Sequence, residues 1–283
     1  MPPTGVAIVR SAGPGVNFVA MKRIVAFVVL CVLSALPVFA QEWARESLNK
    51  SSRHGEWVTI KNGDRSVQAF VVYPERKDKA PAIVVIHEIF GLTDWVRSVA
   101  DQLAANGYIA IAPDLLSGMG PKGGGTSEFP DQTAAVDAIR KLNPDSVTAD
   151  LNASADYVKK LPAANGKVAV AGFCWGGGQT FRFATNRPDL AAAFVFYGPP
   201  PEDVTKIKAP VYGFYGGNDA RIDATIPATQ DAMKKASKKY DPVTYEGAGH
   251  GFMRSGQDPA GKDADKKAHD DAWKRWQELL KTM

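Results

Sequence analysis

Cysteine is scarce in this chain of 283 residues, which has only Cys31 and Cys174. Two cysteines can form neither a multi-disulfide framework nor a four-cysteine zinc site. An excess of one charge is also lacking: 34 basic residues face 30 acidic ones, and the first 40 positions hold three bases and no acid. The remaining balance of 31 to 30 argues against the broad basic surface of a nucleic-acid-binding protein. A hydrophobic content of 45% instead indicates a globular protein.

Motifs for nucleotides and metals are missing as well. No G-x-G-x-x-G opens a helix after a buried strand, and the glycines of residues 118–125 (GMGPKGGG) lack the spacing of a phosphate-binding loop. The chain has no H-E-x-x-H and no C-x-x-C pair. The sequence therefore predicts no metal and no organic cofactor, and it predicts a small molecule as the partner. It does not determine the oligomeric state, for which a monomer is the default expectation.

A targeting signal is predicted near the amino terminus. Two basic residues precede the apolar run 24–36, and residues 38–40 (VFA) have the small-residue pattern of a cleavage site. The run of 13 residues is shorter than the roughly 20 needed to span a bilayer, which favours a cleaved signal over stable membrane insertion. We expect residues 1–40 to be a signal peptide with an upstream extension, translation to start at Met21, and the mature protein to be periplasmic or secreted.

After a polar leader at 41–55, a single domain is predicted over residues 56–283. Two early strands flank a turn at 62–65 (NGDR). Apolar runs then alternate with helical patterns, which is typical of βα units that build a mostly parallel sheet between two helix layers. The predicted strands are 57–61, 66–74, 82–88, 108–112, 167–172, 191–198 and 210–217, and the predicted helices are 94–106, 148–161, 177–186, 226–239 and 263–281.

One segment has the pattern of a catalytic nucleophile. Cys174 lies in G-x-C-x-G between a predicted strand and a predicted helix, with Gly172 and Gly176 on either side. This is the nucleophile elbow with sulfur in place of a serine hydroxyl. The flanking glycines fit because the turn strains the nucleophile and brings strand and helix close together. We expect the helix start to favour the thiolate, while a buried, inert thiol is the alternative for a lone cysteine.

A base and an orienting acid follow in the chain order that this pattern requires. Asp219 comes just after the predicted strand 210–217, and His250 follows the residues VTYEGAG. Asp223 is the alternative acid. The other three histidines are poorer bases by position, because they lie in the leader, at the end of the first buried strand and on the terminal helix. The order and spacing predict a triad.

Acyl transfer also needs hydrogen-bond donors for the oxyanion. The backbone amides of Ile89 and Trp175 are predicted for this role, because one follows the first buried strand and the other follows the nucleophile. Glu88 places a carboxylate at the same sheet edge, although taken alone it is a solvated loop residue. The Gly-rich segment 118–125 is predicted to be a mobile loop at this edge.

These residues together resemble the dienelactone hydrolase (carboxymethylenebutenolidase-like) family of α/β hydrolases. The motifs that carry the resemblance are HEIFG (87–91), APDL (112–115), GFCWGG (172–177), FYG (196–198) and GHGF (249–252). The resemblance covers roughly residues 56–280 and implies an α/β-hydrolase fold with a triad of Cys174, His250 and Asp219. It implies that the sulfur attacks the carbonyl of a lactone or ester. It also implies that Glu88 helps to form the thiolate when substrate arrives.

The resemblance further implies two substrate-binding residues. Arg254 stands where the family has an arginine that binds the substrate carboxylate, and Tyr197 matches a family tyrosine near the nucleophile. A second family arginine is missing, because residues 118–136 contain none and Lys122 is the only cation there. This departure points to an acid other than dienelactone itself or to a looser pocket.

The sequence as a whole predicts an exported hydrolase that cleaves a small, anionic lactone or carboxylic ester through a cysteine thioester. Two alternatives stay open. An acyltransferase would use the same triad and pass the acyl group to an alcohol or amine. A non-catalytic exported protein would use the pocket to bind an anionic ligand. A redox-sensing role for the thiol is a weaker alternative.

Overall fold

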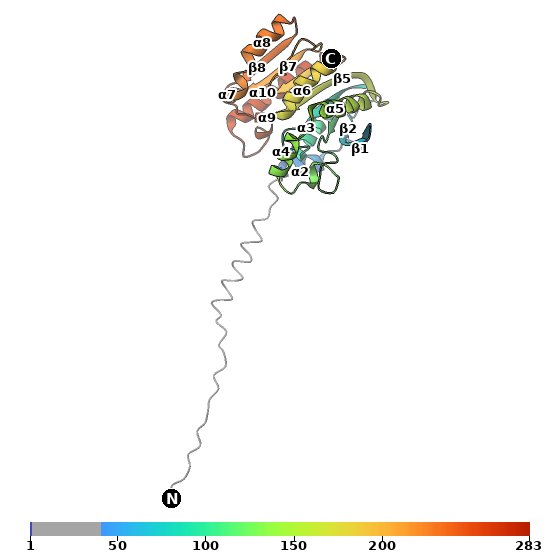
Figure 1. Cartoon of the computed structure of the whole chain (residues 1–283), viewed down its shortest axis with the longest axis vertical. Coiled ribbons are helices and arrows are strands. Elements are labelled where there is room, and N and C mark those ends of the chain that lie inside the picture. The colour runs from blue at the N-terminus through green and yellow to red at the C-terminus, as the bar shows by residue number, and fades with distance from the viewer. Residues whose placement is uncertain (2–40) are drawn as a thin grey trace. The chain divides into compact units, whose positions relative to one another are not determined.

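One eight-stranded sheet organises the protein in the computed structural model, which describes Met1 and residues 41–283. The strands are β1 (Gly55–Asn62), β2 (Arg65–Val72), β3 (Ala80–Ile86), β4 (Ile109–Pro113), β5 (Ala164–Phe173), β6 (Ala193–Phe196), β7 (Val211–Gly216) and β8 (Tyr240–Tyr245). Their order across the sheet is β1-β2-β4-β3-β5-β6-β7-β8. The first two neighbouring pairs are antiparallel and the rest are parallel. Figure 1 shows β1 and β2 at one end of the sheet and β7 and β8 at the other.

Helices cover both faces of this sheet (Figure 1). The helices are α2 (Glu42–Lys50), α3 (Asp94–Ala105), the 3-10 turn η1 (Thr126–Glu128), α4 (Gln132–Arg140), α5 (Pro144–Lys159), α6 (Trp175–Asn186), α7 (Ala220–Asp223), α8 (Ile226–Lys235), α9 (Phe252–Ser255) and α10 (Asp263–Leu280). Helices α5, α6 and α8 pack on one face, and α2, α3, α9 and α10 pack on the other. Within residues 41–283, no helix is both long and apolar enough to cross a membrane.

Strand β3 shows why a continuous apolar run becomes a central strand. Ile83 and Val85 belong to one hydrophobic core, whereas Val84 and Ile86 belong to the core on the opposite face. All four side chains are fully buried. A strand covered by helices on both faces has no solvent side, so no polar residue alternates with the apolar ones. The predicted single α/β domain, with a mostly parallel sheet and helices on both faces, is confirmed.

The order of the strands places one pair of loops side by side. Strand β3 lies between β4 and β5. The chain therefore continues from β3 to β4 on one side of it and later crosses to β5 on its other side. Ile86 is in register with Gly172, which brings residues 87–89 beside the turn at Cys174. Open α/β sheets bind ligands at such a reversal, outside the carboxyl ends of the strands. The fold thus brings the two predicted oxyanion donors together.

The amino-terminal part of the described chain is more regular than predicted. The predicted leader 41–55 contains helix α2, whose Ala44 is fully buried. The side chain of Gln41 accepts a hydrogen bond from the Trp95 amide at 2.9 Å. A polar sequence conceals this helix because only one narrow stripe of it touches the core.

Helix boundaries also differ from the predictions. Helix α5 begins at Pro144, four residues before the predicted start, because the Asn143 side chain caps the amides of Asp145 and Ser146. The short helices α4, α7 and α9 were not predicted. Segments of four to nine residues carry too little periodicity to be recognised in a sequence.

The Gly-rich segment 118–125, predicted to be mobile, is held by two carboxylates. Asp114 accepts hydrogen bonds from the amide and the hydroxyl of Thr126, each at 2.7 Å. Glu128 accepts hydrogen bonds from two backbone amides inside the segment, each at 2.9 Å. These contacts close the segment on itself and favour one conformation over a mobile loop.

Candidate active site

Cys174 lies at a sharp turn between β5 and α6. Its φ of 56° is in the left-handed region that residues with a side chain rarely adopt. A Cβ on Gly172 would overlap the Gly176 carbonyl oxygen, and a Cβ on Gly176 would overlap the carbonyl oxygens that end β3. Both glycines are therefore required by the close crossing of strand and helix. The predicted elbow geometry is present.

Opposing effects act on the protonation of the Cys174 thiol. The backbone amides of Trp175 and Ile89 lower its pKa, as the start of a helix should. Burial and the negative charge of Glu88 outweigh them, so the pKa of the thiol is raised. The resting site therefore favours the neutral thiol, and forming a thiolate requires a change in its surroundings.

The amides predicted as oxyanion donors both lower the pKa of the Cys174 thiol, so both lie near its sulfur. A buried histidine supports their loops. His87 Nδ1 lies 2.8 Å from the Glu88 carbonyl oxygen and His87 Nε2 accepts a hydrogen bond from the Leu115 amide at 3.3 Å. Its ring stacks on Trp175 with the centroids 5.5 Å apart. Sequence reasoning set His87 aside as a base, and no local signal indicated this supporting contact.

His250 and Asp219 are joined by a direct hydrogen bond between Nδ1 and a carboxylate oxygen. Asp219 is 7% exposed, and the His250 side chain is 32% exposed, so the acid is enclosed while the imidazole reaches solvent. The alternative acid, Asp223, is not the partner that the structure gives to His250. Nδ1 faces the carboxylate, so Nε2 is available to a proton donor.

Asn218, the residue before Asp219, connects the loop that carries Asp219 to the loop that carries His250. The backbone amide of Asn218 donates to the Ala248 carbonyl and its side-chain amide donates to the Gly247 carbonyl, each at 2.8 Å. These bonds tie the turn after β7 to the turn after β8. Asn218 was not singled out in the sequence, because its role depends on two segments that are about thirty residues apart.

Glu88 and Arg254 form a buried ion pair. Arg254 Nε lies 2.7 Å from a Glu88 carboxylate oxygen, and the Glu88 side chain is only 3% exposed. Burial raises the pKa of the Glu88 carboxyl, and the charges of Arg254 and His250 oppose that rise. The reading of Glu88 as a solvated loop residue is wrong, because Arg254 compensates its charge inside the protein.

Tyr197 lies at the centre of these groups. The residue is fully buried, and its ring packs edge-on to His250 with centroids 5.1 Å apart. Its hydroxyl has no hydrogen-bond partner among the described residues. Burial raises the pKa of Tyr197 well above its usual value, and Glu88 and Cys174 add to that rise. Tyr197 also has a φ of 40°, a strained value for a residue with a side chain.

One further cation lies near the thiol. The positive charge of Arg221, two residues after Asp219, lowers the pKa of Cys174. Arg221 was not predicted, because the family resemblance places the second cation among residues 118–136. The structure thus brings together all eight predicted site residues at one edge of the sheet: Cys174, Asp219, His250, Glu88, Ile89, Trp175, Arg254 and Tyr197.

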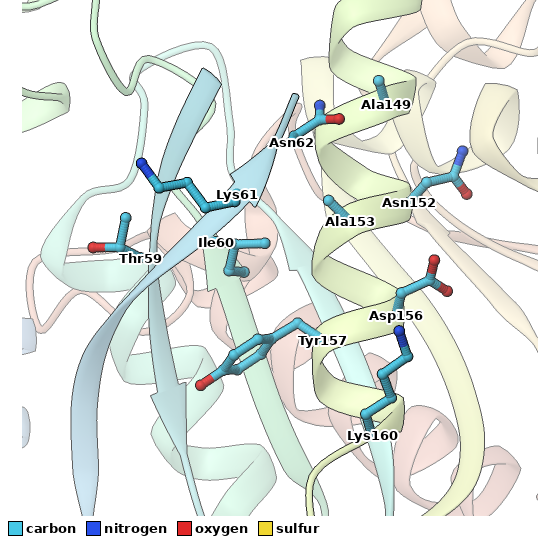
Figure 2. A pocket seen from close by; sticks show the side chains of 10 residues that line it. All are labelled: Thr59, Ile60, Lys61, Asn62, Ala149, Asn152, Ala153, Asp156, Tyr157 and Lys160. Carbon is cyan, nitrogen blue, oxygen red and sulfur yellow. The ribbon is translucent and has the colours of Figure 1, made fainter. Parts of the chain in front are cut away.

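A separate groove of about 590 Å³ lies between β1 and α5. Figure 2 shows Ile60 and Asn62 of β1 on the side of α5, whereas the side chains of Thr59 and Lys61 point away from that helix. None of the predicted site residues lines this groove. It is a different surface from the sheet edge that carries Cys174.

The chain is similar in sequence to proteins of one known family. The model of the dienelactone hydrolase family matches residues 67–283. A protein of Salmonella typhimurium assigned as a carboxymethylenebutenolidase is 33% identical over 199 residues, which cover 65% of this chain and 72% of the relative. A Synechocystis protein assigned the same name is 30% identical over 245 residues, covering 80% of this chain and 95% of the relative.

A solved structure agrees with these sequence matches. The crystal structure of a protein assigned as a dienelactone hydrolase from Klebsiella pneumoniae superposes with a TM-score of 0.71 at 26% identity. The superposition covers 82% of this chain and 100% of the other. The likeness therefore extends over nearly all of the sheet and its helices.

Proposed function

Because the chain belongs to the dienelactone hydrolase family, it is a carboxylic ester or lactone hydrolase, and we propose that it works through a thioester on Cys174. The observation that carries the proposal is the hydrogen-bonded pair of His250 and Asp219, which lies at the same edge of the parallel sheet as the strained turn of Cys174. A nucleophile, a base and an orienting acid in this order are the requirements of covalent acyl transfer.

In the proposed acylation step, His250 Nε2 takes the thiol proton while Sγ attacks the carbonyl carbon. The oxyanion that forms is stabilised by the amides of Ile89 and Trp175. The ester C–O bond then breaks, and the proton passes from His250 to the leaving oxygen. Asp219 holds the imidazole in the tautomer that leaves Nε2 free to accept.

In the proposed deacylation step, water attacks the thioester carbonyl. His250 accepts a proton from the water, and the C–S bond breaks as the carboxylic acid forms. The proton on His250 returns to the sulfur, which restores the neutral thiol of the resting site. No group outside the described residues is required for these two steps.

Glu88 acts before the chemistry in this proposal. A carboxylate on the substrate competes for Arg254, which leaves the buried Glu88 without its counter-ion. Its pKa, already raised by burial, then rises further and the carboxyl takes a proton from solvent. A neutral Glu88 no longer repels the thiolate, so the pKa of Cys174 falls and the transfer to His250 becomes easier.

This order of events predicts an unusual result for Glu88→Gln. The variant should be alkylated faster at Cys174 near neutral pH, on the order of tenfold, because one nearby negative charge shifts a pKa by about one unit. Iodoacetamide labelling across a pH series, read on the peptide that contains Cys174, measures this. The midpoint should move to lower pH, since the wild-type thiol has a raised pKa.

The same experiment contains its own controls. A simple dicarboxylate should accelerate labelling of the wild type and leave Glu88→Gln unchanged. Glu246→Gln, an exposed change after β8, should behave as the wild type. Slower labelling of Glu88→Gln would mean that the carboxylate is itself the base for the thiol.

We also propose that the substrate is anionic, because Arg254 is the cation that Glu88 holds at the site. Wild-type protein should hydrolyse an aryl ester whose acyl chain ends in a carboxylate about tenfold or more faster, by kcat/KM, than the matched ester ending in a neutral amide. Arg254→Ala should remove this preference, mainly through KM. Arg140→Ala, an exposed change on α4, serves as the control. An unchanged preference in Arg254→Ala would remove the anionic substrate from the proposal.

Export completes the proposal, with cleavage after Ala40. A mature chain that begins at Gln41 keeps the hydrogen bond from the Trp95 amide to the Gln41 side chain, and with it the start of α2. Mass spectrometry of the protein recovered from the periplasmic or medium fraction should find Gln41 at the amino terminus. A cytoplasmic product that retains residues 21–40 would contradict export.

A further inference from the structure

Two of the proposed functional side chains are carried by one short segment, residues 249–257. His250 lies at its start, and Arg254 lies on α9. Helix α9 has only four residues, and it begins at Gly251 in the left-handed conformation with a φ of 81°. So short a helix does not hold its own position. The placement of both side chains depends on contacts from other parts of the chain.

Asp265 supplies two of these contacts from the first turn of α10. Its Oδ1 accepts a hydrogen bond from the Gly249 amide at 2.9 Å, next to His250. Its Oδ2 accepts a hydrogen bond from the Ser255 hydroxyl at 2.8 Å, next to Arg254. The residue is 8% exposed. One carboxylate thus holds both ends of the stretch that carries the base and the cation.

The chemistry of the two partners explains why a carboxylate lies there. A backbone amide and a hydroxyl are both donors, and an ionised carboxylate presents two acceptor oxygens and no donor. Hydrogen bonds to a charged acceptor are roughly twice as strong as neutral ones. The charge also lies at the start of α10, where the helix dipole favours a negative group.

Helix α10 is a firm support for this carboxylate. Its Ala272 and Trp276 are fully buried in the core that covers one face of the sheet. The end of α9 lies directly against it, since a Cβ on Gly256 would overlap the Asp265 carbonyl oxygen. Residues 249–257 are therefore held in place by a helix that is itself anchored in the hydrophobic core.

We propose that Asp265 is a positioning residue that sets His250 and Arg254 in place together, through its bonds to Gly249 and Ser255. The inference rests on the proposed function, because it assigns no reaction of its own. A displacement of about 1 Å of a catalytic group costs on the order of a hundredfold in rate. Removing the Asp265 carboxylate should therefore impair both proton transfer by His250 and substrate binding by Arg254.

Three variants test this. Asp265→Ala should lower kcat/KM for a carboxylate-bearing aryl ester about a hundredfold, with a fall in kcat and a rise in KM. Asp265→Asn should recover most of the activity, because its oxygen can accept from the Gly249 amide and its NH₂ can donate to the Ser255 hydroxyl. Asp263→Ala, an exposed aspartate in the same turn, should match the wild type.

Ser255→Ala separates the two tethers. It removes the bond on the Arg254 side and leaves the Gly249 bond intact. KM for the carboxylate-bearing ester should rise severalfold, while kcat for the matched neutral ester should stay unchanged. Asp265→Ala should lower kcat for both esters. If the two variants gave the same profile, the carboxylate would not be acting on two separate groups.

Measurements that do not depend on turnover keep the inference testable. Thermal melting shows whether Asp265→Ala is folded, and the pH dependence of Cys174 alkylation shows whether the imidazole is still placed beside the thiol. A folded Asp265→Ala with the activity and alkylation profile of Asp263→Ala would overturn the positioning role. Absence of any ester or lactone turnover in the wild type would instead contradict the proposed function.

Discussion

Cys174→Ala is expected to lower kcat/KM for the preferred ester by about 10⁴-fold or more, because removal of a covalent nucleophile leaves only binding and oxyanion stabilisation. Both donor amides belong to the backbone, so the variant keeps them. Alanine accepts the φ of 56° no worse than cysteine does, so the fold should be unchanged. The measurement is steady-state turnover of wild type and variant, with melting temperatures to confirm equal folding.

Trapping the intermediate makes the same test more specific. Wild-type protein mixed with a slow ester should gain the mass of the acyl group on the peptide that contains Cys174, and Cys174→Ala should gain none. Cys174→Ser keeps the geometry but has a much less acidic group, so it should react more slowly and form an oxygen ester. Turnover that survives in Cys174→Ala would contradict a thioester mechanism.

The products distinguish hydrolysis from acyl transfer to another acceptor. With water alone the wild type should release the free acid at the full rate. An added alcohol or amine should change the product distribution only in proportion to its concentration. A large increase in total turnover on adding such an acceptor would favour the acyltransferase alternative.

Asp219→Asn should have the second largest effect, about 10⁴-fold in kcat, because an asparagine can impose the wrong histidine tautomer. Its NH₂ group would donate to His250 Nδ1, which would leave the proton on Nε2. Nε2 could then no longer accept the thiol proton. The fold should survive, since the change is isosteric. Turnover across pH, together with the rate of Cys174 alkylation, measures the loss.

Asp223→Asn is the matched control for that change. Asp223 ends the short helix α7, which begins directly after Asp219, and burial together with the Asp219 charge raises the pKa of Asp223. It is not bonded to His250 and takes no part in the proposed steps, so its substitution should change kcat by less than about threefold. A loss as large as that of Asp219→Asn would mean that the two carboxylates act as a unit.

Local sequence patterns were enough to predict the nucleophile turn. The glycines at 172 and 176 are required by the close contact of strand and helix, and that requirement follows from the residues next to Cys174. The buried strands were predicted for a similar reason, since a strand covered on both faces must be apolar throughout. The predicted strand 210–217 placed the acid, whereas β8 (Tyr240–Tyr245), which precedes His250, was not predicted.

The environment of the site could not be predicted in this way. The helix start after Cys174 is visible in the sequence and was expected to favour the thiolate, whereas the burial of the thiol and the charge of Glu88 depend on how β3 and β5 lie beside each other. The pairing of Glu88 with Arg254 joins residues 166 positions apart. Only the folded chain shows which cation compensates that carboxylate.

The sequence by itself determined the class of fold, and it predicted a nucleophile, an acid and a base in a fixed chain order, because these depend on short-range spacing. Tertiary structure decided which charges meet, which protons are retained and which distant side chains hold the catalytic loops. Asn218 and Asp265 belong to that second group, since their hydrogen bonds connect segments that no local pattern relates. Electrostatic energies depend on distance and burial, and both are properties of the packed molecule.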